Sequence, residues 1–169
     1  MQPWIQVRVA SRHQETDAIC VLRLVALPGD PPLPRFTAGS HVDIRMNPTL
    51  IRQYSLSSDP AEAGFYEIGV LREAASRGGS SFMHDQVVEG QLIEIAAPRN
   101  HFPLASTPRP SLLLAGGIGI TPLLGMAARL ALLGQPFELH YCARSEDSAA
   151  FRAQLARSCL LYTSPSPRD

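Results

Sequence analysis

The spacing of the apolar residues changes once along this chain, near a proline-containing stretch at residues 105–110, and this change constrains the fold most. Before it, short runs of extended character are separated by glycine and proline. The runs are residues 5–9, 18–25, 41–46, 53–56, 66–71 and 92–95. Alternation of apolar and polar residues is typical of half-buried strands. Several such runs at close spacing predict a small antiparallel barrel, which we place in residues 1–106.

Residues 107–158 have an α/β pattern instead. The run at 111–115 is continuously apolar, as in a strand covered on both faces. A helix is expected over 122–133, with Pro122 at its first position and Gly134 beyond its end. A strand at 137–142 and a helix over 149–157 are also expected. This is one βαβ unit and a fragment, which is the first part of an incomplete parallel domain.

The composition excludes several classes of partner. The chain has 169 residues, and its 15 basic and 15 acidic residues give a net charge of zero, so it has no electrostatic footprint for nucleic acid or an anionic membrane. No apolar stretch is long enough to span a bilayer, and no export signal begins the chain. Cys20, Cys142 and Cys159 have neither metal-ligand nor disulfide spacing. We therefore expect a cytoplasmic protein that binds neither membrane nor nucleic acid.

A glycine-rich loop follows the apolar strand at 111–115. Gly116, Gly117 and Gly119 lie where the strand passes into a helix, and there glycine lets the backbone turn tightly and a ligand approach closely. Pro122 stands where the usual dinucleotide fingerprint has its third glycine. A glycine turn without any ligand remains the alternative. Arg144, after the next strand, is suited to a phosphate or an adenine face, and the choice between NADH and NADPH stays open.

A second candidate site lies on the strand at 53–56. Arg52 and Tyr54 share one face, where they offer a cation and a flat π surface to a flavin. Ser55, whose hydroxyl or amide suits flavin N5, falls on the other face by strict alternation. Its role therefore requires a bulge or a main-chain contact. The alternative is an ordinary surface strand with a solvated arginine.

The segment at residues 77–81 is a candidate phosphate turn. Two glycines before a helix start form a nest of amide groups, Ser80 and Ser81 add donors, and Arg77 adds a counter-charge. A short helix is expected over 81–87, with Ser80 as its N-cap. A flexible Gly-Ser loop is the alternative.

Four motifs in order resemble the family of phthalate dioxygenase reductases and vanillate demethylase reductases. They are residues 52–56 (RQYSL), 77–80 (RGGS), 98–104 (PRNHFPL) and 115–122 (AGGIGITP). The resemblance implies a six-stranded antiparallel Greek-key barrel that binds FMN, then an NAD-binding domain, and then a C-terminal [2Fe-2S] domain.

The resemblance also implies the site residues. The FMN contacts would be Arg52, Gln53, Tyr54, Ser55, Gly69, Val70, Leu71, Arg77, Gly78, Gly79, Ser80, Ser81 and Thr121. The NADH contacts would be Gly116, Gly117, Gly119, Pro122 and Arg144. Ser55 and Thr121 would be the catalytic residues, placed where the nicotinamide meets the flavin.

The implied function is electron transfer from NADH through FMN to a [2Fe-2S] centre, and from there to a terminal Rieske-type oxygenase that degrades or demethylates an aromatic compound. One alternative is an FAD-dependent reductase of the ferredoxin/flavodoxin–NADP type, for which residues 82–84 offer only a weak adenine-stacking candidate. The other is an FMN-binding barrel without catalysis.

The sequence departs from the family in two respects. The C-x4-C-x2-C cysteines of a plant-type cluster are not present, so we expect that cluster only in a C-terminal domain outside this chain. Residues 159–169 resemble a translated sequencing-library adaptor, and we expect them to be non-native. We therefore expect a truncated reductase with impaired function.

Overall fold

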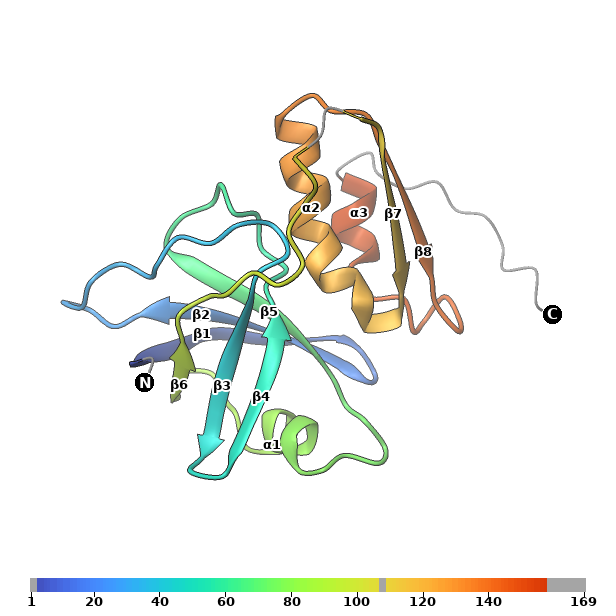
Figure 1. Ribbon diagram of the computed structural model, residues 1–169. Helices are drawn as coiled ribbons and strands as arrows, with labels where there is room; N and C mark the ends of the chain where they lie inside the picture. The colour runs from blue at the N-terminus through green and yellow to red at the C-terminus, as the bar shows by residue number, and fades with distance from the viewer. Residues whose placement is uncertain (1–2, 107–108, 158–169) are drawn as a thin grey trace.

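The computed structural model describes residues 3–106 and 109–157. Its first unit is built from β1 (Trp4–Thr16), β2 (Ile19–Ala26), β3 (His41–Asn47), β4 (Leu50–Ser55), β5 (Phe65–Leu71), α1 (Gly79–Asp85) and β6 (Leu92–Ala96). The six strands form one antiparallel sheet in the order β4-β3-β6-β1-β2-β5 (Figure 1). Strand β6 returns between β3 and β1, which is a Greek-key connection. The predicted six-stranded antiparallel fold is confirmed.

Two features close the sheet into a barrel. Leu56, directly after β4, forms an antiparallel bridge with Ile68 of β5, so the two edge strands of the sheet meet. Strand β1 extends well beyond the predicted strand at residues 5–9. It pairs first with β6 and then with β2. Its pairing with β2 shifts register between Val9 and Ser11, and such irregularities bend and twist a strand. The long bent strand therefore turns the sheet around the core.

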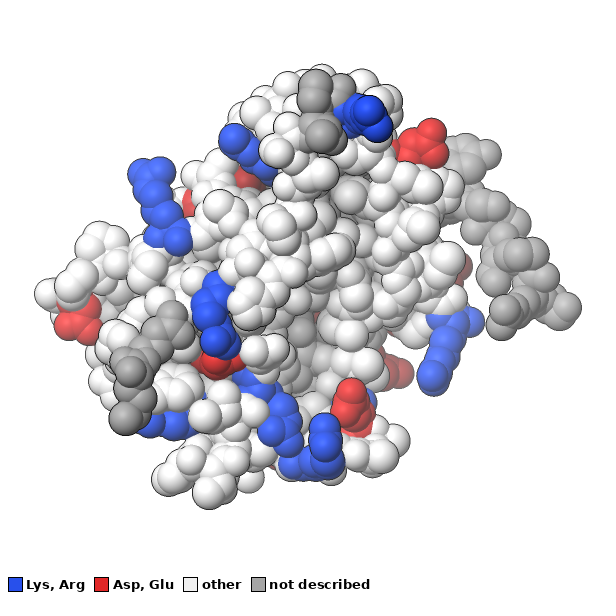
Figure 2. Space-filling view, in the orientation of Figure 1, with Lys and Arg blue, Asp and Glu red and all other residues white. Residues whose placement is uncertain are grey.

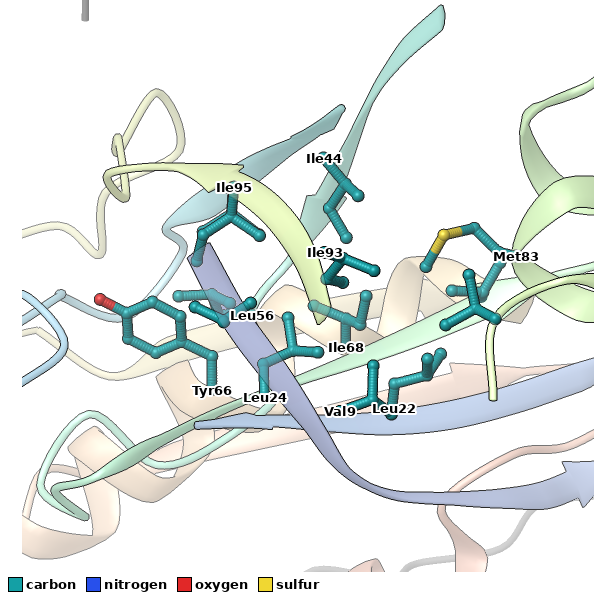
Figure 3. Close-up of a cluster of buried hydrophobic side chains, with 14 of the residues drawn as sticks. Val9, Leu22, Leu24, Ile44, Leu56, Tyr66, Ile68, Met83, Ile93 and Ile95 are labelled. Carbon is teal, nitrogen blue, oxygen red and sulfur yellow. The ribbon is translucent and has the colours of Figure 1, made fainter. Parts of the chain in front are cut away.

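The barrel interior is filled by alternate residues of the strands. Figure 3 shows Leu22, Leu24, Ile68 and Ile95 pointing toward one another inside the barrel. Tyr66, which is 2% exposed, donates a hydrogen bond from its hydroxyl to the Pro34 carbonyl. Burial raises the pKa of this phenol. The core is thus apolar, and its buried hydroxyl is satisfied.

The second unit is a parallel pair of strands with helices on one face. It consists of β7 (Ser111–Gly116), η1 (Gly117–Gly119), α2 (Ile120–Leu132), β8 (Phe137–Cys142) and α3 (Arg152–Arg157). Strand β8 runs parallel to β7, as the βαβ pattern predicted. Figure 1 shows this unit beside one end of the barrel, with α2 lying between β7 and the barrel.

Three predicted helix starts are wrong, and one of them is that of α3, which begins at Arg152 and not at residue 149. Helix α2 begins at Ile120, after Gly119 as N-cap, so Pro122 lies within the first turn. That position is permitted because the first amide groups of a helix have no intrahelical acceptor. Helix α1 begins at Gly79, and its N-cap is Gly78 in the left-handed conformation with φ 86°, not Ser80. Glycine adopts this backbone without strain, and no side-chain cap is formed there.

One buried cluster spans both units. Ile19 and Val21 of β2 pack with Leu123 and Leu124 of α2, so β2 is covered on both faces. The predicted domain boundary at 106/107 adjoins residues outside the described ranges, and the predicted non-native tail at 159–169 lies outside those ranges. Among residues 3–106 and 109–157, no helix is both long and apolar enough to cross a membrane.

Candidate functional site

A cavity of about 430 Å³ lies where β4, the turn before α1 and the glycine loop meet. Its lining residues are Arg52, Gln53, Tyr54, Ser55, Gly69, Leu71, Glu73, Ser76, Arg77, Gly79, Ser80, Ile118, Gly119, Thr121 and Pro122. Three segments that the sequence marked separately therefore share one cavity. Figure 2 shows positive and negative side chains mixed over the visible face, with several arginines toward the lower edge, in the region of β3, β4 and α1.

Arg52 connects β4 to the turn before α1. Its Nη2 donates to the Arg77 carbonyl at 3.2 Å, and its Nη1 donates to the Ile51 carbonyl at 2.8 Å. The stem crosses Gly79 so closely that a Cβ on Gly79 would lie 2.7 Å from Arg52 Cγ. Glycine is therefore required at position 79 for Arg52 to lie in the cavity wall.

The turn before α1 is held by serine hydroxyls. Ser80 Oγ donates to Ser76 Oγ at 3.0 Å and accepts from the Glu73 amide at 3.1 Å. In the described part of the chain, no carboxylate lies within ion-pair distance of Arg52 or Arg77. Both guanidinium groups are thus free to pair with an anion, although Glu73 also lines the cavity.

Tyr54 lies half-buried between the cavity and the barrel core. Burial raises its pKa to about 12, against the opposing effect of the Arg52 charge. The phenol is therefore neutral at physiological pH. Its uncharged ring is suited to packing against a flat apolar ligand.

Ser55 lines the cavity without a bulge, which was one of the two routes that strict alternation left open for its role. The pairing of β3 with β4 is regular from Arg52 to Ser55, and β4 ends at Ser55. The cavity extends around this strand end, so adjacent residues line it together.

A smaller cavity of about 220 Å³ adjoins this point and shares Gln53, Ser55 and Pro122. Its other wall contains His41 and His101, whose rings pack edge to face at 5.1 Å. Burial, followed by the Arg99 and His101 charges, lowers the pKa of His41.

The glycine loop forms the opposite wall of the larger cavity. A Cβ at Gly116, Gly117 or Gly119 would meet nothing within 4 Å, so the open side of the loop has room for a ligand. The hydroxyl of Thr121 donates to the Ile118 carbonyl at 3.0 Å and fixes the first turn of α2. A hydrogen bond between Thr121 and Ile118 thus fixes the conformation of the loop, while its glycines leave space for a ligand.

Gly69 of β5 is the contact point between the barrel and this loop. A Cβ there would lie 3.0 Å from Thr121 Cγ2, 3.1 Å from Phe151 Cζ and 3.3 Å from Ile118 Cδ1. The neighbouring residue Val70 points its side chain into the barrel core, and its carbonyl lies 2.9 Å from His84 Nε2. Gly69 therefore accommodates the second unit as well as lining the cavity.

The cavity contains most, but not all, of the predicted residues. Val70, Gly78, Ser81, Gly116, Gly117 and Arg144 do not line it. Arg144 is exposed in the loop after β8. Sequence reasoning missed Glu73, Ser76 and Ile118, of which Ser76 and Ile118 stand directly beside or within the predicted motifs. Within residues 3–106 and 109–157, no group of three or more His, Cys, Asp and Glu side chains could hold a metal ion.

Known proteins with similar sequences include two reductases. The vanillate O-demethylase oxidoreductase of Pseudomonas putida is 52% identical over 147 residues, which are 87% of this chain and 46% of that protein. The phthalate 4,5-dioxygenase reductase subunit of Pseudomonas putida is 47% identical over 124 residues, which are 73% of this chain and 38% of that protein. No family model matches the chain.

Two solved structures are also similar to this chain. The phthalate dioxygenase reductase structure superposes with a TM-score of 0.85 at 36% identity, over 90% of this chain and 48% of that one. An intact type IV self-sufficient cytochrome P450 monooxygenase superposes with a TM-score of 0.86 at 37% identity, over 91% of this chain and 20% of that one.

The barrel and its attached parallel unit have a ferredoxin reductase-like fold. Over the residues that match, the chain belongs to the family of phthalate dioxygenase reductases and vanillate O-demethylase oxidoreductases. These relatives are oxidoreductase components of oxygenase systems. The chain spans less than half the length of these relatives.

Proposed function

We propose that the larger cavity binds FMN and that the whole protein is the reductase component of a multicomponent oxygenase. One observation carries the proposal: β4, the turn before α1 and the glycine loop line a single cavity. FMN combines a flat ring, a polyol chain and a terminal phosphate. The cavity offers an aromatic wall at Tyr54, serine hydroxyls, and two arginines without carboxylate partners in the described part of the chain.

Each lining segment has a distinct role in this proposal. Arg52 and Arg77 hold the phosphate by charge-assisted hydrogen bonds, and the Ser80 hydroxyl, which otherwise donates to Ser76, turns to donate to the phosphate. Tyr54 packs against the ring, while Ser55 and Thr121 orient the reacting edge. The open side of Gly119 and Pro122 admits the nicotinamide of NADH and orients it toward the flavin. When bound, FMN accepts a hydride from a reduced nicotinamide and releases single electrons.

The partners in this proposal follow from the relatives. In the whole protein, a [2Fe-2S] domain would carry electrons from the flavin to a terminal Rieske-type oxygenase in the cytoplasm. The names of the relatives include vanillate and phthalate systems, so an aromatic compound is the proposed final substrate class of that oxygenase.

The residues around α1 favour FMN over FAD. An FAD-dependent reductase would need an aromatic side chain beyond the phosphate turn to stack on adenine. Phe82 packs against the barrel core, Met83 is 0% exposed, and His84 Nε2 lies 2.9 Å from the Val70 carbonyl. These side chains are engaged in the barrel and are unavailable to an adenine ring.

Titration of the purified chain with FMN, riboflavin and FAD, followed by quenching of flavin fluorescence, tests the proposal. We expect FMN to bind at least about tenfold more tightly than riboflavin, because the phosphate pairs with two arginines. Arg52→Ala should remove most of that difference, whereas Arg129→Ala, which changes an exposed arginine on α2, should not. No saturable binding of FMN, or equal affinity for riboflavin, would overturn the proposal.

A further inference from the structure

The turn before α3 has an unusual backbone at Phe151. Among the described residues, Phe151 is the one non-glycine residue with positive φ, at 63°. Aromatic residues rarely adopt this left-handed conformation, and it persists only where neighbouring contacts enforce it. Phe151 is 4% exposed and the preceding Ala150 is 0% exposed, so packing holds the turn in place.

Two hydrogen bonds fasten this turn. The Phe151 amide donates to Glu15 Oε1 of β1 at 2.7 Å, across 136 residues of chain. The Ala150 amide donates to the Tyr141 hydroxyl at 3.1 Å. Burial raises the pKa of Tyr141, so its hydroxyl is protonated and neutral. A carboxylate that accepts from a backbone amide forms one of the stronger hydrogen bonds in proteins.

The fastened turn places the Phe151 ring beside the candidate site. Phe151 Cζ, Thr121 Cγ2 and Ile118 Cδ1 all lie within 3.3 Å of the point where a Gly69 Cβ would be. Ile118 and Thr121 both line the larger cavity. Phe151 is thus part of the packing around Gly69 that includes these two cavity-lining residues.

We propose that Glu15 is a positioning residue for the glycine loop. Its carboxylate, on the barrel, holds the left-handed turn of the second unit, and through Phe151 that turn keeps Ile118 and Thr121 at the cavity wall. The functional consequence rests on the proposed flavin site. The mechanical part, in which Glu15 orders the loop, does not depend on any ligand.

Amide hydrogen exchange in the purified chain without flavin tests the mechanical part. Glu15→Ala should speed exchange at Phe151 and at residues 118–121 by about tenfold, which is the effect of losing one hydrogen bond to a charged group. Glu15→Gln keeps an oxygen acceptor and should stay within about twofold of the unaltered chain. His13→Ala is the matched control, because His13 lies 3.3 Å from the other Glu15 oxygen and leaves the Phe151 contact intact.

The exchange rates of core amides of the barrel, such as those of Leu22 and Ile68, show whether Glu15→Ala loosens only the glycine loop or destabilises the whole chain. Equal acceleration at these amides in Glu15→Ala would overturn the proposal, and so would unchanged exchange at residues 118–121. If Glu15→Ala does not fold, Glu15→Asp takes its place, because it keeps the charge but draws the carboxylate back from the Phe151 amide. It should loosen the same loop by a smaller factor, and an unaltered loop would contradict the proposal.

The visible circular dichroism of added FMN provides the functional readout. Glu15→Ala should change this signal at similar FMN affinity, because the phosphate turn is untouched, and Glu15→Gln should restore it. An unchanged signal with a loosened loop would refute the functional part alone. If the unaltered chain does not bind FMN, the proposed function fails, while the exchange experiment still decides the role of Glu15.

Discussion

Gly69 has no side chain at the point where three side chains of the second unit meet the barrel. In Gly69→Ala, the new methyl would lie 3.0 to 3.3 Å from Thr121, Phe151 and Ile118. Such crowding costs about 1–3 kcal/mol in a packed interior. Urea unfolding should therefore show a lower free energy of unfolding.

Gly116→Ala is the matched control for Gly69→Ala. A Cβ at Gly116 would meet nothing within 4 Å, and its backbone is extended, at φ −125°. It should change the free energy of unfolding by less than about 0.5 kcal/mol, as surface changes usually do. Equal effects of the two substitutions would contradict the crowding at Gly69.

Tyr54 makes the stability of the folded chain decrease at alkaline pH. Burial raises its pKa from 10.0 to about 12, so between these values the unfolded chain releases a proton that the folded chain keeps. The free energy of unfolding therefore falls as pH rises through this window. In Tyr54→Phe the fall between pH 9.5 and pH 11.5, measured by urea unfolding, should be smaller. A fall of the same size in Tyr54→Phe and in the unaltered chain would show that Tyr54 titrates normally.

At the scale of elements, two adjacent serines at the start of α1 differ in their position relative to the cavity. Ser80 lines the cavity and connects Ser76 with the Glu73 amide, whereas Ser81 does not line it. Ser80→Ala should weaken FMN binding about fivefold, the equivalent of about 1 kcal/mol for a lost hydrogen bond. Ser81→Ala should leave FMN affinity unchanged. Isothermal titration calorimetry measures both, and a larger loss in Ser81→Ala would reverse the assignment.

The positions of the strands could be predicted from their local pattern, but β7, which was predicted to be covered on both faces, exposes Leu112 and Leu114 on one of them. Strand β8 has the predicted bounds, and β7 differs by one residue, because continuous or alternating apolar residues need no other information. The helix starts were less predictable. Gly78 caps α1 through its backbone conformation, and the serines that resemble caps are used instead to close the preceding turn.

Spacing and composition predicted the segments of the candidate site separately, and only the family resemblance implied that they converge on one FMN. Nothing local in residues 65–71 distinguishes Gly69 as a contact between units, since a glycine in a strand also marks bulges and bends. The link from Glu15 to Phe151 spans 136 residues and has no motif. Tertiary packing therefore determines which members of each string line the cavity.

At the scale of the whole molecule, the sheet of the second unit leaves an apolar face uncovered. Leu112 is 60% exposed and Leu114 is 67% exposed, side by side on β7. Contiguous exposed apolar residues promote association. Sedimentation velocity should show concentration-dependent self-association that Leu112→Lys with Leu114→Lys abolishes. Val88→Lys, which changes a 59% exposed residue of the barrel unit, should leave it unaltered. Identical association of all three proteins would exclude this face.

We propose that three segments far apart in sequence form one flavin site. The backbone amide NMR spectrum of the chain, recorded as FMN is added, tests this most directly. We predict that the largest shift changes fall at residues 52–55, 69–71, 76–80 and 118–122, which surround the larger cavity. Shift changes confined to one segment, or centred on His41 and His101 of the smaller cavity, would contradict the claim.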